Sequence, residues 1–268
     1  LYTDFSGAMD IVLGISECFG IVLPENFETP FFAKSISEYW RRWHITLGVW
    51  MKEYVFYPVL RTKAFTSLNK KWKQKFGKKK GKQYTTFVAM FILWFTVGVW
   101  HGGDWKYVIG SGLLHWCYIV LEELLAPPCQ KAMDHLHVNA EGRMVAVVRV
   151  IRTFFLVCIG DLFFRAASVG DAFWMLRESV SVWNPQILWN GELLNLGLEP
   201  LELLIAVLSL LLLWLVSWLQ QKGSVREWIA AKALPVRWII WYALLFYVIL
   251  LGCYGPGYSA SEFIYQGF

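Results

Sequence analysis

LELLIAVLSLLLLWLVSWL, residues 201–219, is the cleanest apolar stretch of the chain, with one charged side chain, Glu202, near its start. A helix needs about 20 such residues to cross the hydrocarbon core of a bilayer. In lipid every backbone N–H and C=O must pair within the protein, which a helix achieves by itself. The stretch therefore predicts a transmembrane helix.

Apolar stretches on the N-terminal and C-terminal sides of this segment predict more spans. These cover residues 84–100, 107–125, 144–167 and 237–253. The span over 144–167 also carries Arg149, Arg152, Asp161 and Arg165, which indicate ion pairs within the membrane or side chains that reach the interface. The sequence thus predicts an all-α, polytopic transmembrane helical bundle with interfacial or re-entrant helices.

The composition of the 268 residues excludes several other classes. Hydrophobic residues make up 57% and charged residues 17% of the chain, against roughly 25% charged in soluble domains. This excludes a disordered chain and argues against an ordinary soluble domain. The five cysteines form no CxxC pair, so no disulfide framework or metal cluster is predicted.

The positive charge of the chain is local. Residues 61–82 contain ten Lys or Arg and no acid, which is typical of a basic cytoplasmic loop between spans and argues against a nucleic-acid partner. With 126–152 and 220–237 on the same side, that side holds eighteen basic residues and the other three. The pattern predicts a multi-pass protein of the plasma membrane, with residues 1–268 as one membrane-embedded domain.

Two polar helices are predicted before the basic segment, the first over residues 5–23. The second begins at Ser35, where Ser35-Ile36-Ser37-Glu38 matches a capping box. A helical wheel from Trp40 places Trp43 and His44 on the apolar face as far as Tyr54, with Arg41 and Arg42 opposite. We expect one amphipathic helix at the membrane surface.

Two histidines lie in stretches rich in Trp and Gly. His44 ends Trp40-Arg41-Arg42-Trp43-His44, and His101 follows Trp100 and precedes Gly102-Gly103-Asp104. An ionisable group near bilayer depth is costly and therefore a functional candidate, and imidazole exchanges protons near neutral pH. The alternative for His101 is a packed histidine that donates to a carbonyl, and the alternative for His44 is a hydrogen-bonded histidine in a Trp-rich interface. His115 is interpreted as a buried structural residue.

Four stretches resemble the membrane-bound O-acyltransferase family, on its bacterial polysaccharide branch, which includes alginate O-acetyltransferases. They are residues 2–10 with 23–27, residues 37–47 (SEYWRRWHITL), residues 98–105 (GVWHGGDW), and residues 254–258 with 262–265. The resemblance starts within the family's sequence, so we expect that several N-terminal membrane helices precede this C-terminal part.

The resemblance implies an activity. An acetyl group would pass from a cytoplasmic thioester, acetyl-CoA or an acyl-carrier thioester, toward an exported polysaccharide. His101 would act as general base, and His44 would bind the donor or shuttle a proton. An extracytoplasmic acetyltransferase-type partner would complete the transfer, and membrane lipid surrounds the chain. No bound cofactor and no metal are implied.

Residues near the histidines are candidate substrate-binding groups. Arg41 and Arg42 could meet the phosphates of a coenzyme A donor or lipid headgroups, with neither favoured. Trp40, Trp43 and Trp100 could contact substrate, although packing and interfacial anchoring are the simpler interpretation of Trp40 and Trp43. Asp104 could orient His101 or end a helix.

Two other functions remain open. One is D-alanyl transfer to teichoic acid from a carrier-protein thioester, within the same family. The other is a membrane transporter, which often shows paired broken helices in two related halves. The sequence shows one break, at 101–105, and no second copy.

Overall fold

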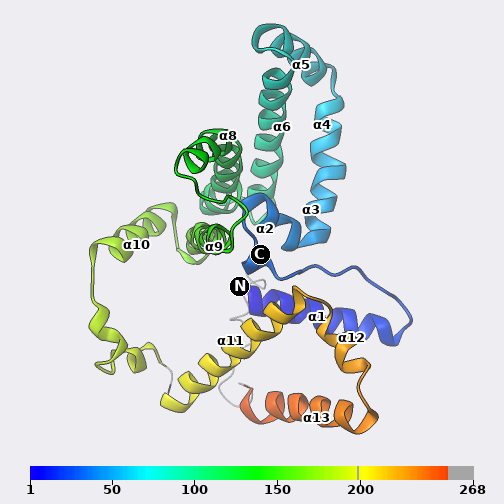
Figure 1. Ribbon diagram of the computed structural model, residues 1–268, viewed down its shortest axis with the longest axis vertical. Coiled ribbons are helices and arrows are strands. Elements are labelled where there is room, and N and C mark those ends of the chain that lie inside the picture. The colour runs from blue at the N-terminus through cyan, green and yellow to red at the C-terminus, as the bar shows by residue number, and fades with distance from the viewer. Residues whose placement is uncertain (198, 253–268) are drawn as a thin grey trace. The chain divides into compact units, whose positions relative to one another are not determined.

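The computed structural model describes residues 1–197 and 199–252 (Figure 1). Within these residues the chain is helical and forms no strand, apart from an isolated bridge between Phe27 and Trp43. It divides into two compact units, Leu1–Ser181 and a second that begins at Val182. The all-α prediction is confirmed. That both units act as one domain stays a prediction, and the stretches 254–258 and 262–265 lie outside the described residues.

Four helical segments are long and apolar enough to cross a membrane. In the first unit they are α6 (Lys78–Trp100) and the continuous segment Trp105–His135, which comprises α7 (Trp105–Tyr107), the π-helical η3 (Val108–Leu113) and α8 (Leu114–His135). In the second unit they are α11 (Pro200–Gln220) and α13 (Leu234–Leu251). The predicted span over 144–167 is a helix, α9 (Arg143–Arg165), but it is not among the four because of its charges.

Several further described elements are short or lie at the surface. They are α1 (Tyr2–Cys18), η1 (Pro30–Phe32), α10 (Val169–Ser181), η4 (Pro185–Leu188), η5 (Glu192–Leu196) and α12 (Val225–Ala230). In the second unit, a contact between the Ser209 and Tyr247 hydroxyls joins α11 to α13. Their apolar side chains are largely exposed, as expected of side chains that face lipid.

The predicted helix from Ser35 to Tyr54 is wrong as a single element. The chain forms α2 (Ile36–Arg42), then Trp43 in an extended conformation and His44 at φ +44°, then α3 (Ile45–Met51), the π-helical η2 (Lys52–Phe56) and α4 (Tyr57–Arg61). The break pairs with an earlier segment: Glu28 N–H donates to Arg42 C=O at 2.9 Å, and Ile45 N–H donates to Asn26 C=O at 3.1 Å. A helical wheel cannot show such long-range bonds.

The basic segment 61–82 is not a loop in the structure. It forms α5 (Lys63–Phe76), a turn at Gly77 with φ +84°, and the first turn of α6 (Figure 1). The Thr62 side chain accepts the Phe65 N–H at 3.3 Å and so caps α5. A Cβ on Gly81 would lie 2.4 Å from the Lys73 nitrogen, so the α5 and α6 backbones touch. The lysines therefore lie on a packed helical hairpin, formed by α5 and the start of α6. The position of this basic segment in the cytoplasm stays a prediction.

The polar loop predicted over 126–143 begins later than expected. Helix α8 continues through Pro127 and Pro128 to His135. A hydrogen bond from the Gln130 amide to the Asp134 carboxylate at 2.8 Å supports its last turn. The loop is therefore confined to the residues between α8 and α9.

One ion pair and its hydrogen bonds connect α9, α8 and the start of α2. Arg152 of α9 pairs with Glu122 of α8 and donates to the Lys34 carbonyl at 3.1 Å. The Glu122 carboxylate also accepts the Ile36 N–H at the start of α2, at 3.2 Å. Arg152 thus forms an ion pair, but its partner is Glu122 of another helix and not Asp161 of the predicted set.

Candidate active site

His101 lies where α6 ends. Its N–H donates to the Val97 carbonyl at 3.1 Å, and the chain then turns through Gly102 and Gly103, both at positive φ (119° and 77°). Glycine adopts these angles without the Cβ clash of other residues. The His101 side chain is buried, with 8% exposed, and contacts the edge of the Phe164 ring at 5.1 Å. The predicted break after His101 is confirmed.

His44 sits at the break between α2 and α3. Its φ of +44° is a left-handed conformation that costs about 1–3 kcal/mol for a residue with a side chain. Its ring packs edge-on against Phe5 of α1 at 4.6 Å, and its Nδ1 lies 3.2 Å from the Asn26 side-chain oxygen. The surrounding contacts therefore hold both the backbone and the ring of His44.

Trp100 connects the two histidines. The centroid of its ring lies 6.0 Å from that of His44 and 4.8 Å from that of His101. Its side chain is 47% exposed, so one part of the indole faces the histidines and another part remains accessible. The structure thus brings together three of the predicted site residues: His44, Trp100 and His101.

Burial keeps both histidines neutral. Desolvation lowers the pKa of His44 from 6.5 to about 4. Desolvation, together with a smaller contribution from the charge of a protonated His44, also lowers the pKa of His101 to about 4. At neutral pH each ring therefore has a nitrogen lone pair that can accept a proton, and a proton on one histidine disfavours a proton on the other.

His115 forms a second, separate cluster with Trp40. The Trp40 indole N–H donates to His115 Nδ1 at 3.3 Å, and the His115 ring stacks on Trp94 at 5.8 Å. A Cβ on Gly160 of α9 would lie 2.7 Å from His115 Nε2, so the ring is enclosed. Trp40 thus uses its only donor on a buried histidine rather than presenting it beside His44.

Trp43 is also a packing residue in the structure. It is 5% exposed, stacks on Tyr39 at 5.5 Å, and meets Tyr2 and Phe27 at 5.8 and 5.0 Å. Its side chain is therefore surrounded by aromatic rings of α1, α2 and the segment before η1.

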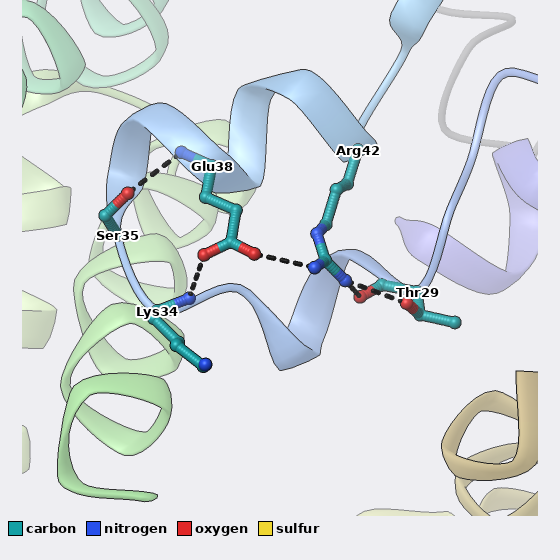
Figure 2. Close-up of polar contacts among 5 residues, drawn as sticks. All are labelled: Thr29, Lys34, Ser35, Glu38 and Arg42. Atoms are coloured by element: carbon teal, nitrogen blue, oxygen red, sulfur yellow. Dashed lines mark hydrogen bonds and ion pairs between the residues drawn. The ribbon is translucent and has the colours of Figure 1, made fainter. Parts of the chain in front are cut away.

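Arg41 and Arg42 differ in their surroundings. The Arg42 guanidinium bonds to the Glu38 carboxylate at 2.6 Å and to the Thr29 hydroxyl at 3.0 Å, as Figure 2 shows. Arg41 is exposed. Of the two, Arg41 is the one whose side chain can meet a ligand phosphate without breaking an ion pair.

The predicted capping box of α2 is half right. The Ser35 hydroxyl accepts the Glu38 N–H at 3.0 Å, as expected. The Glu38 carboxylate, however, accepts the Lys34 N–H at 2.8 Å, one residue earlier than the capping-box pattern predicts (Figure 2). The other oxygen of the Glu38 carboxylate pairs with Arg42.

Asp104 caps a helix. Its carboxylate accepts the Lys106 N–H at 3.2 Å at the start of α7, and the Lys106 ammonium donates to the Ala166 carbonyl at 2.9 Å. Asp104 therefore begins α7, whereas the sequence left open that it orients His101 or ends a helix. No group of three or more possible metal ligands occurs among the described residues.

Asn26 has no assigned role in the sequence analysis, although it lies in a stretch that carries the resemblance. The structure places its side-chain oxygen at the centre of three contacts: with the Thr46 hydroxyl at 2.6 Å, the Thr46 N–H at 3.2 Å and His44 Nδ1 at 3.2 Å. The spacing of these residues gives no signal for this arrangement, because it depends on the break at His44.

Comparison with known proteins agrees with this architecture. A family model described as MBOAT, membrane-bound O-acyltransferase family, matches residues 1–164. The match includes both histidines and all of the predicted site residues.

Several curated proteins are similar to the chain. A probable alginate O-acetylase of Pseudomonas aeruginosa is 30% identical over 78% of this chain and 35% of its own length. A peptidoglycan O-acetyltransferase of Helicobacter pylori is 30% identical over 68% of this chain and 30% of its own length. A teichoic acid D-alanyltransferase of Bacillus subtilis is 33% identical over 61% of this chain and 38% of its own length. The chain spans about a third of the length of these relatives.

Proposed function

The chain belongs to the membrane-bound O-acyltransferase family, and from this premise we propose that it forms the catalytic part of a polysaccharide O-acetyltransferase. The enzyme moves an acetyl group from a cytoplasmic thioester toward an exported cell-surface polysaccharide. The donor is acetyl-CoA or an acyl-carrier thioester, used as a co-substrate. The similarity to two bacterial O-acetyltransferases supports this choice of acyl group.

The reaction requires a proton acceptor. As the acceptor oxygen bonds to the thioester carbonyl carbon, its proton moves to neutral His101, for about 10²–10⁴-fold in rate. The tetrahedral intermediate then collapses, the C–S bond breaks, and the leaving thiolate takes up the proton that His101 holds. His101 returns to its neutral form for the next cycle.

One observation carries the proposal: two neutral histidines, distant in the sequence, lie on the same indole ring at the end of α6. Burial among aromatic rings keeps water away, which protects a thioester from hydrolysis. His44 is the second catalytic candidate, and it stays neutral while His101 holds the proton because the two charges repel. Trp100 forms a wall of this site.

The donor side of the proposal involves fewer residues than the sequence indicated. Arg41 is exposed and can meet donor phosphates or lipid headgroups. Arg42, Trp40 and Trp43 support the site through packing and hydrogen bonds. Asp104 supports it by capping α7.

We place the protein in the plasma membrane of a bacterium, the inner membrane where there are two, with residues 61–82, which form α5 and the first turn of α6, in the cytoplasm. The excess of lysine on that segment supports this orientation. The acceptor then lies on the other side, where an extracytoplasmic acetyltransferase-type protein completes the transfer.

D-alanyl transfer is the second candidate function. The 33% identity to a teichoic acid D-alanyltransferase favours it, and the same general-base chemistry would serve. The donor in that case is a thioester on a carrier protein, which is a macromolecule rather than a nucleotide.

The test uses membrane vesicles that contain the full-length protein, supplied with labelled acetyl-CoA or with carrier-bound D-alanine. We expect His101→Ala to insert normally and to lose transfer at least about 10²-fold. His135→Ala is the matched control, because His135 is exposed at the end of α8. Normal transfer by His101→Ala refutes the assignment of the base, and labelling from the D-alanyl carrier alone selects the second candidate.

A further inference from the structure

The contacts of Asn26 determine which of its side-chain atoms faces His44. The Thr46 backbone N–H is a donor, and it lies 3.2 Å from the Asn26 Oδ1 atom. The Thr46 hydroxyl points to the same atom at 2.6 Å. The side-chain atom of Asn26 at this position must therefore be the acceptor oxygen. The amide nitrogen is itself a donor and would face the Thr46 N–H with no acceptor between them.

The tautomer of His44 follows from this identity. An acceptor oxygen 3.2 Å from Nδ1 is favourable only if Nδ1 carries the hydrogen. In the neutral ring the other nitrogen, Nε2, then has the lone pair. We propose that Asn26 is a positioning residue that holds His44 as the Nδ1–H tautomer, so that Nε2 accepts a hydrogen bond or a proton at the site.

The backbone of the break supports a positioning role. The Asn26 carbonyl accepts the Ile45 N–H at 3.1 Å, so the same residue holds α3 by its main chain and the His44 ring by its side chain. The left-handed backbone of His44 is energetically unfavourable and persists because such contacts stabilise it. Asn26 thus holds both the positive φ of His44 and the tautomer of its ring.

This inference rests on the proposed catalytic role of His44. Its Nε2 can act as an acceptor for the substrate hydroxyl or for a proton passing to or from His101. In the opposite tautomer, Nε2–H could only donate, and the relay would be blocked. In a serine protease triad, a histidine in the wrong tautomer loses about 10⁴-fold in rate. We expect roughly 10²-fold here, because His101 remains as the principal base.

The test measures the tautomer directly. The full-length protein is labelled with ¹⁵N-histidine in lipid, and solid-state NMR separates protonated from bare ring nitrogens. The His44 signals are identified by their loss in His44→Gln. We expect a neutral ring with hydrogen on Nδ1 in the wild type, and finding hydrogen on Nε2 overturns the proposal whatever the variants do.

Three variants test the cause. Asn26→Asp keeps an acceptor oxygen and should keep the Nδ1–H form and most of the transfer. Asn26→Leu has a similar size but no acceptor, and it should lose the fixed tautomer and roughly 10²-fold in transfer. Thr46→Val removes the hydroxyl bond to the Asn26 oxygen but leaves the contact between that oxygen and His44. It is the matched control, and it should change neither the tautomer of His44 nor the rate of transfer.

The outcomes separate this inference from the proposed function. If His44→Gln transfers acetyl normally, the catalytic role of His44 fails, and with it the role of Asn26 in transfer. If His44→Gln is inactive while Asn26→Leu has a changed tautomer and full activity, the inference alone fails. Loss of both tautomer and transfer in Asn26→Leu, with rescue by Asn26→Asp, supports it; equal loss in Asn26→Asp contradicts it.

Discussion

Replacement of Gly98 by alanine tests how α6 holds the site. A Cβ on Gly98 would lie 2.5 Å from the Val108 Cα and 3.0 Å from the Tyr107 carbonyl oxygen. Gly112 of η3 makes the reciprocal contact, since its Cβ would lie 2.5 Å from the Trp94 carbonyl oxygen. These neighbours are backbone atoms and cannot rotate away, so α6 and η3 must separate to admit a methyl group.

The size of the effect follows from this geometry. Carbon atoms in contact prefer a separation of about 3.5–4.0 Å, so the two segments must move apart by roughly 1 Å. Overpacking of this kind costs about 1–3 kcal/mol of unfolding free energy. His101 follows Gly98 by one helical turn, and a displacement of about 1 Å at a reacting group can cost about 10²-fold in rate.

Two measurements test this expectation. One is denaturant unfolding of the purified protein in mixed micelles, and the other is acyl transfer in vesicles. Gly14→Ala is the control, because Gly14 lies in helix α1 with nothing within 4 Å of its added Cβ, and it should be neutral or stabilising by up to about 1 kcal/mol. If Gly98→Ala unfolds within about 0.5 kcal/mol of the wild type and keeps full transfer, the close α6–η3 packing is refuted.

Two more predictions concern the histidines. Because the pKa of both His44 and His101 falls from 6.5 to about 4 on folding, the unfolded chain binds more protons between these values. The free energy of unfolding should therefore rise with pH from about 4 to 6.5, and this rise should shrink when both are replaced by glutamine; an unchanged pH profile contradicts the assigned burial. Trp40→Phe should cost about 1 kcal/mol in a melting experiment, because it leaves His115 Nδ1 without its donor. Trp50→Phe, at a 49% exposed position, should cost less than about 0.5 kcal/mol, and equal effects of the two would count against the Trp40–His115 bond.

The transmembrane helices were predictable because their signal is local and additive. Each apolar residue of 201–219 favours a lipid environment by itself, and only a helix pairs all its backbone groups there. The capping of α2 by Ser35 and the Glu38–Arg42 ion pair were predictable for a similar reason, because these partners are three and four residues apart on one helix.

Two of the errors involve contacts between distant segments. Helix propensity alone would continue α2 through Trp43, but bonds to residues 26–28 stop it and turn His44. The lysines of 61–82 resemble a loop by composition, yet packing of α5 on α6 at Gly81 makes them helical. A local sequence pattern cannot show how much a contact between two distant backbone segments stabilises the fold.

The amino-acid sequence alone determined that this chain is a helical membrane protein and singled out two histidines as catalytic candidates, because hydropathy and the two histidine motifs can be recognised in consecutive residues. Only the tertiary structure decided that Trp100 joins these histidines, that Trp40 belongs to His115, and that Asn26 faces His44. The physical reason is range: a hydrogen bond or ring contact acts over a few ångströms, and folding alone brings residues far apart in the chain within that distance.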